Sequence, residues 1–318
     1  MEEPARLTMQ ITIIASGSGG NATLFSSGGT RILVDAGVGP RILKEAIEGL
    51  DNRGDPGAWA PHAIVITHAH ADHYGCAASY SKRLRIPVHV TESTARAGVA
   101  LGDKERVRLY SAREPFAIGA LTISPRPLPH DAAQVALVVS DGARRAAVVT
   151  DLGEVPPGLV EHLAGCDVLL IESNHDERML AEGPYPGHLK RRIRSSRGHL
   201  SNTQTHGLLT AVRRAGPPGP HTVVLMHLSE PNNIPALALE VACDALGGSL
   251  ESGARDDPSP GRPMATAAGA WLLAAPPRGP LRIDAAAAPP EPLPPRPGGD
   301  RERVAAGLAR QLSLFPRP

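Results

Sequence analysis

The sequence predicts an α/β fold in which two β-sheets pack face to face and helices cover their outer sides. Hydrophobic residues make up 42% of the 318 residues, which is enough for a sizeable core. Aromatic residues contribute only 3%, so this core has to be aliphatic. Short apolar runs come in groups, with helical patterns between and after them, and this order is typical of stacked sheets flanked by helices.

The first part of the chain predicts strands separated by glycine-rich turns. The turn residues 16–21 and the pair Gly28-Gly29 bound the first apolar runs. Residues 40–50 have helical spacing, because Ile42, Leu43 and Ala46 share one face. The expected strands are 9–15, 22–26, 30–35, 63–67 and 87–90, and the expected helices are 40–50 and 76–84.

The second part repeats this pattern, and its composition changes near residue 250. The expected strands are 116–125, 135–140, 145–150, 168–172 and 222–227, and the expected helices are 157–163, 203–214 and 234–246. We therefore predict one large domain over residues 1–250, to which residues 264–284 could return one or two strands. An alanine- and proline-rich linker is expected over 285–300, followed by a tail over 301–318.

Charge and cysteine content limit the partners and the cellular compartment that can be expected for this protein. Lys+Arg number 33 against 32 Asp+Glu, so any attraction to phosphate has to come from a local patch. The cysteines Cys76, Cys166 and Cys243 are widely spaced, which predicts no disulfide framework and a reducing compartment. The start of the chain lacks the features of a signal peptide, and no apolar run approaches the roughly 20 residues of a membrane span. We expect a cytoplasmic protein that does not enter membranes.

Four polar residues just after the predicted strand 63–67 form the most distinctive motif, His68-x-His70-x-Asp72-His73. Imidazole and carboxylate groups are ligands for Zn, Mn or Fe. On an extended backbone, positions two apart point the same way, so His68 and His70 can bind one ion together. Asp72 and His73 would then face a neighbouring ion. The chain has only 13 histidines, so a solvated loop with chance histidines is a poor explanation of this cluster.

Further ligands are expected at the ends of other buried strands. His130 follows the run 122–129, Asp151 follows 146–150, and His227 ends the run 223–226. Any one of them alone is more commonly a capping or hydrogen-bonded residue. Their repeated placement at the end of a predicted strand favours a shared metal site.

Taken together, these motifs resemble the metallo-β-lactamase superfamily, and the match extends over nearly all of residues 9–250. The resemblance implies an αββα sandwich that holds two divalent ions, Zn, Mn or Fe, roughly 3.5–4 Å apart. It implies the following ligands: His68, His70 and His130 for metal one, Asp72, His73 and His227 for metal two, and Asp151 as the bridge.

Two neighbouring cations would lower the pKa of a shared water, so that a metal-bridging hydroxide is the expected nucleophile. Superfamily membership alone does not define the substrate. The segments Gly17-Ser-Gly-Gly-Asn21, Glu172-Ser-Asn-His-Asp176, Gly198-His-Leu-Ser-Asn202 and His227-Leu-Ser-Glu-Pro-Asn-Asn233 resemble one branch, the YycJ/WalJ-type hydrolases, which are described as DNA exonucleases.

A basic segment precedes the Gly198 motif and would attract a phosphate backbone if it lies beside the metals. The alternative is an ordinary solvated helix face. His199 could bind a phosphate oxygen or donate a proton to the leaving oxygen. The expected phosphate-binding residues are Lys190, Arg191, Arg194 and His199, and the expected catalytic residues are Asp72, Asp151 and His199.

The C-terminal peptide Gln311-Leu312-Ser-Leu314-Phe315 resembles the short motif by which bacterial replication and repair proteins dock on the sliding clamp. Large apolar side chains in a tail usually cover a partner or a groove on their own domain. The hypothesis is that this tail tethers the enzyme to a clamp on DNA and raises its local concentration there.

The sequence therefore predicts a two-metal phosphodiester hydrolase acting on DNA, an exonuclease of DNA repair or replication. Three alternatives stay open. They are a thioester or small-ester hydrolase of the glyoxalase II type, an RNA-processing nuclease, and a metal-binding scaffold without activity.

Overall fold

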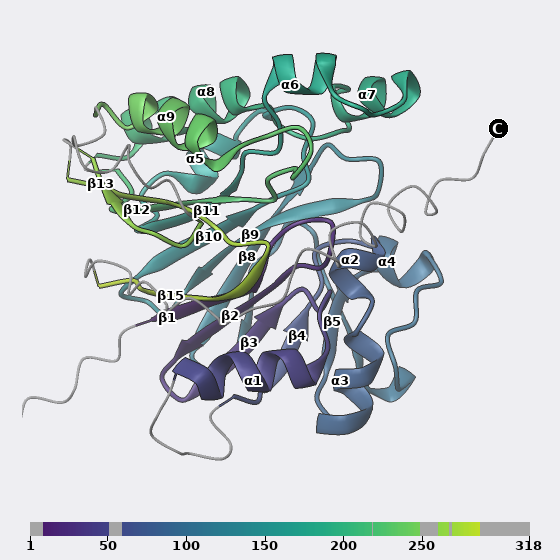
Figure 1. Cartoon of the computed structure of the whole chain (residues 1–318). Coiled ribbons are helices and arrows are strands. Elements are labelled where there is room, and N and C mark those ends of the chain that lie inside the picture. Colours follow the sequence, from purple (N-terminus) through teal and green to yellow (C-terminus); the bar gives the residue numbers. More distant parts are fainter. Residues whose placement is uncertain (1–8, 51–58, 218, 249–259, 267–268, 287–318) are drawn as a thin grey trace, which may run out of the picture.

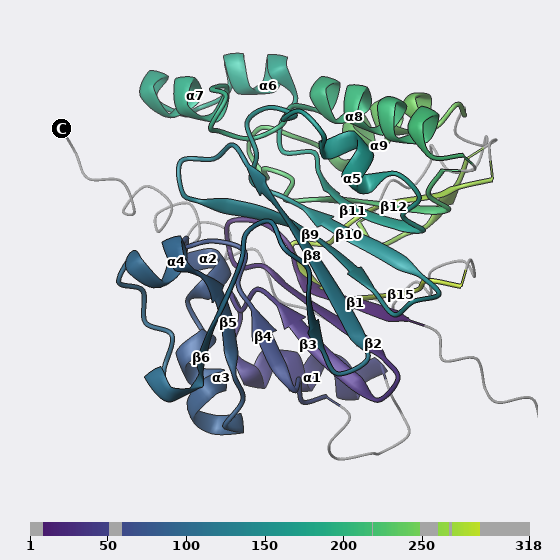
Figure 2. The ribbon, with the colours of Figure 1, turned by 180° about the vertical axis from the view of Figure 1, so that it is seen from behind.

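Two β-sheets lie face to face at the centre of the protein, and helices cover both outer sides (Figure 1). The computed structural model describes residues 9–50, 59–217, 219–248, 260–266 and 269–286. Helices α5 to α9 cover one sheet, and α1 and α3 lie beneath the other, as the reverse view also shows (Figure 2). The predicted αββα sandwich is confirmed.

The first sheet has the strand order β15-β1-β2-β3-β4-β5-β6. Its first strands pair antiparallel, whereas β3, β4, β5 and β6 run parallel to one another. The strands of this sheet are β1 (Gln10–Ala15), β2 (Ala22–Ser27), β3 (Thr30–Val34), β4 (Ala63–Val65), β5 (Val88–Thr91), β6 (Val107–Tyr110) and β15 (Arg278–Asp284).

The second sheet has the order β13-β14-β12-β11-β10-β9-β8-β7. Strands β10, β11, β12 and β14 are parallel, and they are almost entirely apolar, as expected for strands buried on both faces. The strands are β7 (Phe116–Ile118), β8 (Leu121–Leu128), β9 (Gln134–Ser140), β10 (Arg145–Val149), β11 (Val168–Glu172), β12 (Thr222–Met226), β13 (Met264–Ala265) and β14 (Trp271–Ala274).

Most helices follow a strand and return the chain to the next one. The long helix α8 begins with a capping box, in which Ser201 and Gln204 each bond the other's backbone amide. The helices are α1 (Pro40–Leu50), α2 (Ala71–Tyr74), α3 (Ala77–Leu84), α4 (Glu92–Arg96), the 3₁₀ turn η1 (Lys104–Arg106), α5 (Leu159–Leu163), α6 (Glu177–Glu182), α7 (Gly187–Ile193), α8 (Asn202–Ala215) and α9 (Pro235–Ala245). Within the described ranges, no helix is both long and apolar enough to cross a bilayer.

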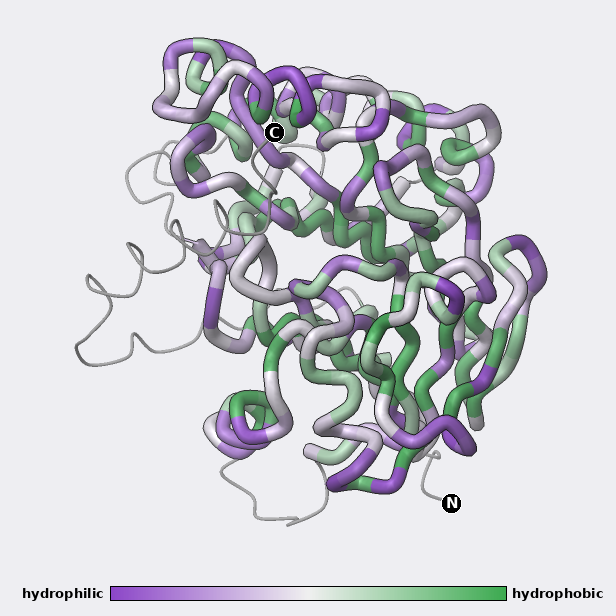
Figure 3. Tube along the Cα trace, turned by 90° about the vertical axis from the view of Figure 1, so that its right-hand side faces the viewer, coloured by the Kyte–Doolittle hydropathy of each residue, from purple (hydrophilic) through white to green (hydrophobic). Residues whose placement is uncertain are grey.

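Aliphatic side chains fill the space between the sheets, as the low aromatic content requires. Ile13, Ile32 and Val34 of the first sheet belong to one buried cluster with Leu137 and Val148 of the second. Figure 3 shows hydrophobic segments concentrated in the interior and hydrophilic ones on the outer helices. Separate apolar clusters join each sheet to its own helices.

The single strand expected over 116–125 was wrong, because these residues form the hairpin β7–β8. Gly119 adopts a φ of 56° at the reversal, a left-handed conformation that glycine reaches without a steric penalty. Beyond Ile123, β9 is the one strand among the described residues that pairs with β8, so the other side of β8 has no described strand partner. Pro125 and Pro127 fall in this part of β8, where a missing N–H is tolerated.

Residues 264–284 supply β13, β14 and β15, so the C-terminal part of the fold extends beyond residue 250. Strand β14 lies parallel to β12 in the second sheet, and β15 lies antiparallel to β1 in the first. The predicted linker from residue 287 onward and the predicted tail 301–318, including the clamp-like peptide 311–315, lie outside the described residues.

Candidate metal centre

The carboxyl ends of parallel strands from both sheets meet at one edge of the sandwich, where ligands commonly bind in α/β folds. Asp35 follows β3, Asp151 follows β10 and His227 follows β12. All three have a left-handed φ of 56–59°. Non-glycine residues adopt this conformation only rarely, and such residues concentrate at functional sites. In each case the backbone leaves its strand abruptly, and the side chain stays at the shared edge.

The His68 motif lies partly on a short helix. After β4 the chain bends through His68 and His70, and α2 then carries Asp72 and His73. The helical turn, which the expectation of an extended loop missed, changes the direction of the last two side chains. A Cβ at Gly37 would lie 1.9 Å from the Asp72 carbonyl oxygen, so this close approach of two backbones requires glycine.

The seven ligand-type residues expected from the sequence come together at this edge. The ligand atoms within each group lie within 4.8 Å of one another. The residues form three overlapping groups. We call His68, His70 and His130 the first ligand group, and Asp72, His73 and His227 the second ligand group. A third group, His68, His73 and Asp151, lies between these two.

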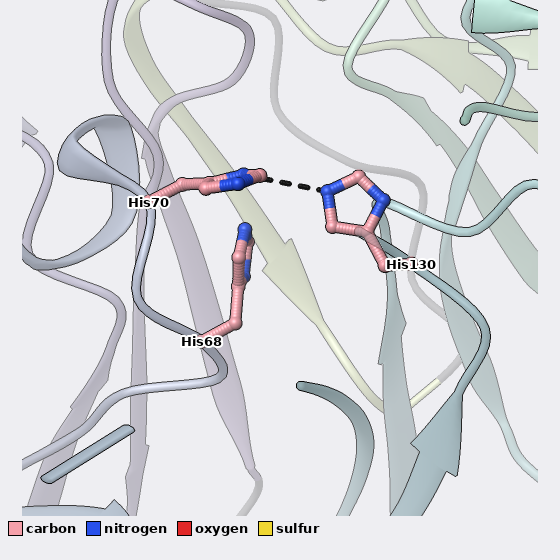
Figure 4. A group of neighbouring side chains, drawn as sticks. All are labelled: His68, His70 and His130. Atoms are coloured by element: carbon pink, nitrogen blue, oxygen red, sulfur yellow. Dashed lines mark hydrogen bonds between the residues drawn. The ribbon is translucent and has the colours of Figure 1, made fainter. Parts of the chain in front are cut away.

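Figure 4 shows the first ligand group, with the His70 and His130 rings facing each other above His68. The ring centroid of His68 lies 4.6 Å from that of His70 and 5.3 Å from that of His130. Nδ1 of His70 lies 3.3 Å from Nε2 of His130. Nε2 of His68 is buried and has no hydrogen-bond partner. Three ring nitrogens therefore converge on one small space.

Each ring of this group has one nitrogen that faces away from the shared space, and that nitrogen contacts a hydrogen-bond acceptor. A neutral imidazole that donates from one nitrogen presents a lone pair on the other, which is the form that binds metal. The inward-facing nitrogens thus fit a cation. The outer contacts are His68 Nδ1 with Thr67 Oγ1 at 3.1 Å, His70 Nε2 with Asp131 Oδ1 at 3.1 Å, and His130 Nδ1 with Gly198 O at 3.2 Å.

The second ligand group follows the same rule with buried carboxylates as acceptors. His73 Nδ1 donates to Asp35 Oδ2 at 2.7 Å, and His227 Nδ1 donates to Glu172 Oε1 at 3.1 Å. Nε2 of His73 lies 3.2 Å from Asp151 Oδ2. Nε2 of His227 is buried without a hydrogen-bond partner. The residues present therefore fit divalent cations at both groups, because the unpaired Nε2 atoms of His68 and His227 lie in groups that also contain a carboxylate, Asp151 or Asp72.

Glu172 organises more of the site than any expected residue, and it is fully buried. Its carboxylate accepts from the backbone amides of Asp151, Leu152 and Leu200 and from Nδ1 of His199 at 2.9 Å. It also accepts from His227, as described above. Burial raises the pKa of Glu172, but the imidazoles of His199 and His227 outweigh this effect and lower it to about 2. Glu172 is thus an ionised buried anchor.

Charge and burial shift other groups at the centre. Burial lowers the pKa of His68 well below its ordinary value, and the neighbouring His73 lowers it further. Burial would raise the pKa of Asp151, but the imidazoles of His227 and His73 lower it well below its ordinary value. His68 is therefore neutral and Asp151 ionised, which are the forms that bind metal ions.

Sequence reasoning missed Asp35, Asp131 and Glu172 as site residues. Asp35 and Glu172 each end a predicted strand, which is the same signal that pointed to Asp151 and His227. Asn21 donates to Asp72 Oδ2 at 3.3 Å and lies 2.9 Å from His73 Nε2, so the glycine-rich turn braces the ligand loop.

The basic segment lies on α7 and the turn that follows it. Among its expected phosphate contacts, His199 alone has a described contact with the ligand groups, since its ring centroid lies 5.4 Å from that of His130. Lys190 donates to the Ala181 carbonyl and Arg194 to the Glu177 carbonyl, both on α6, and Arg191 is exposed. The phosphate-binding roles of these three residues stay predictions.

Residues 30–228 match the family model described as "Beta-lactamase superfamily domain", and the chain belongs to this superfamily. Its fold and family make it a metal-dependent hydrolase, as the sequence predicted. The chain is 29% identical to "Exodeoxyribonuclease YycJ" of Bacillus anthracis over 236 residues, which cover 72% of this chain and 86% of that protein. It is also 29% identical to "Exodeoxyribonuclease WalJ" of Streptococcus pneumoniae over 241 residues, or 74% and 87% of the two chains.

Solved structures show the same fold at low sequence identity. The metallo-beta-lactamase fold protein YhfI from Bacillus subtilis superposes with a TM-score of 0.57 at 18% identity, covering 75% of this chain and 93% of that one. Zn(2+)-bound PqqB from Methylobacterium extorquens has a TM-score of 0.57 at 16% identity, covering 87% and 100%.

Proposed function

We propose that this chain is a two-metal phosphodiester hydrolase that acts on DNA, as an exonuclease in DNA repair or replication. The observation that carries the DNA assignment is the similarity to curated exodeoxyribonucleases over nearly three quarters of the chain. The convergence of seven ligand-type side chains supports two ions of Zn, Mn or Fe. We propose His68, His70 and His130 for one ion, Asp72, His73 and His227 for the other, and Asp151 between them.

When bound, the two ions would activate a water and stabilise the charge that develops on the phosphate. The protein's own contribution is to keep every ligand in the required tautomer. Asp35 and Glu172 hold the outer nitrogens of His73 and His227, so that their Nε2 atoms point inward. Because these supports are buried, the ligand geometry exists before substrate arrives.

His199 is the proposed general acid. Its Nδ1 donates to the ionised Glu172, which leaves Nε2 as the ring atom that can transfer a proton to the departing oxygen. The His199 side chain is 18% exposed, so it lies between the buried anchor and solvent.

End-labelled DNA oligonucleotides test the proposal directly. The parent protein is incubated with Mn, Zn, Mg or chelator, and parallel reactions offer an RNA of the same sequence and a small thioester. Metal-dependent shortening of DNA, faster than that of RNA, supports the proposal and shows the polarity of cleavage. Hydrolysis of RNA or thioester alone would overturn the DNA assignment in favour of those alternatives, and no hydrolysis by a metal-loaded protein would favour the scaffold.

The partners and location expected from the sequence belong to the same proposal. Residues Gln311, Leu312, Leu314 and Phe315 are proposed to dock on the sliding clamp, on the strength of their sequence pattern alone. An enzyme of DNA repair would meet its substrate in the cytoplasm, so the predicted cytoplasmic location is kept as part of the proposal.

A further inference from the structure

A chain of polar contacts leads from the first ligand group to a single arginine of α7. Asp131 Oδ1 lies 3.1 Å from His70 Nε2 and 3.2 Å from His130 Nε2. Its other oxygen, Oδ2, accepts from Arg192 Nε at 2.7 Å and also from Arg192 Nη2. One carboxylate therefore separates the Arg192 guanidinium from two ligand-type histidines.

The backbone around Arg192 is held to the same site. The Gly198 carbonyl accepts from His130 Nδ1, and the His199 amide donates to the Ile193 carbonyl at 2.9 Å. A Cβ at Gly198 would lie 2.1 Å from that carbonyl oxygen, so only glycine allows this close turn. The end of α7 is thus linked by hydrogen bonds to His199 and, through the Gly198 turn, to His130 of the first ligand group.

This pair lies where solvent reaches the first ligand group. The side chains of Asp131 and Arg192 are 31% and 35% exposed, and that of His70 is 32% exposed. Asp35 and Glu172, which support the second ligand group, are 4% and 0% exposed. A substrate phosphate can therefore approach the first ligand group beside Arg192, because the supporting side chains are more exposed there than those of the second ligand group.

We propose that Arg192 binds a phosphate oxygen of the substrate beside the first ligand group, and that Asp131 is the positioning residue that holds its guanidinium there. This inference rests on the proposed function, because it takes the substrate to be a DNA phosphodiester. An arginine has five N–H donors in a fork that matches phosphate, and Asp131 Oδ2 accepts from two of its nitrogens. An arriving phosphate is attracted to the guanidinium while Asp131 keeps it oriented.

The choice of Arg192 over its neighbours follows from their contacts. Lys190 and Arg194 donate to carbonyls of α6, away from the Asp131 contact. A guanidinium tied to a carboxylate next to His70 is already oriented, so little side-chain entropy is lost when phosphate binds.

The test compares the variants Arg192→Ala, Arg192→Lys and Asp131→Asn with the control Arg178→Ala. Arg178 lies on the adjacent helix α6 in an exposed pair with Glu182. Arg178→Ala therefore removes one positive charge, as Arg192→Ala does, but outside the site. Binding of a fluorescent DNA oligonucleotide is measured by anisotropy in chelator, between about 50 and 200 mM salt. KM, kcat and metal content are measured with the loaded proteins.

We expect Arg192→Ala to weaken DNA binding about tenfold and to reduce the slope of log affinity against log salt by about 1. Arg192→Lys should restore the slope, because the charge returns, but not the KM, because a lysine lacks the fork. Asp131→Asn should raise KM several-fold. The double variant Arg192→Ala/Asp131→Asn should have a KM no higher than that of Arg192→Ala alone, because Asp131 affects phosphate binding through Arg192, whereas its contact with His70 would show in metal content.

The inference is overturned if Arg192→Ala matches Arg178→Ala in affinity and salt slope. It is also overturned if Arg192→Ala contains less metal than the parent protein but has the same KM, because the Arg192–Asp131 pair would then only support the metal ligands. Failure of the proposed function looks different. A parent protein that binds DNA through Arg192 but shortens no DNA with any metal would contradict the nuclease and leave the phosphate contact standing.

Discussion

The two sides of the candidate centre are supported in different ways. Around the second ligand group, the buried carboxylates Asp35 and Glu172 hold the outer nitrogens of His73 and His227. Around the first group, the corresponding carboxylate is Asp131, which is exposed and shared with Arg192. Buried anchors favour fixed geometry, whereas an exposed anchor leaves its partners within reach of a charged ligand. On the basis of this difference we propose that one side retains metal and the other contacts substrate.

The largest effect is expected at Asp151, which lies between the two sides. Asp151→Ala should reduce DNA cleavage by more than about 100-fold, the upper end for changes to groups that only support a metal ligand. Metal content, measured by inductively coupled plasma mass spectrometry, should fall at the same time. Asp244→Ala removes an exposed carboxylate from α9 and should change neither quantity. Full cleavage by Asp151→Ala would remove the basis for a shared two-metal centre.

Glu172→Gln tests the buried side with almost no change in shape. Glu172 accepts hydrogen bonds through both carboxylate oxygens. A glutamine replaces one of these oxygens with an NH₂ group, which cannot accept, so at least one of the present donors loses its partner. An unsatisfied buried donor costs about 1–3 kcal/mol, and the melting temperature should fall accordingly. Cleavage should fall about 100-fold because His199 and His227 both lose their anchor. Unchanged melting and cleavage would contradict the role assigned to this carboxylate.

Asp35→Asn separates the two sides most cleanly. Asp35 accepts directly from His73 of the second ligand group, whereas it reaches the first group only through the Thr67 hydroxyl, which contacts His68. The variant should lower affinity at the second ligand group by about 10- to 100-fold, while the first group keeps its ion. Competition with a chelator should then resolve two classes of metal site that differ in affinity, whereas the sites of the parent protein should be more alike in affinity. Equal weakening at both groups would mean that the two sides do not act separately.

The smallest effect on the enzyme itself is expected in the predicted tail. Leu314→Ala/Phe315→Ala should leave cleavage of free oligonucleotides unchanged, because no expected catalytic or metal-ligand residue is altered. Its affinity for a bacterial sliding clamp, measured by surface plasmon resonance, should drop at least about tenfold, as expected when apolar anchors are removed. Ser313→Ala is the matched control. Clamp affinity that does not change would contradict the docking hypothesis.

Local patterns in the sequence were sufficient to predict the two-sheet fold and to point to seven side chains that the structure brings together. The reason is physical. Apolar runs bounded by glycine-rich turns predict strands, and ligand-type residues at the ends of buried strands meet at one edge. The hairpin at 116–128 escaped this reasoning, because its apolar run continues through the turn at Gly119.

Only the tertiary structure decided how the site is supported. Asp35 and His73 are 38 residues apart and Glu172 and His227 are 55 apart, and no periodicity in the sequence links them. Likewise, Arg192 is one of several neighbouring basic residues, and its place beside the first ligand group depends on Asp131, 61 positions earlier. Ligand chemistry is a property of residue type and spacing, whereas the choice of tautomer and of substrate contact depends on which strand ends and helices meet in space.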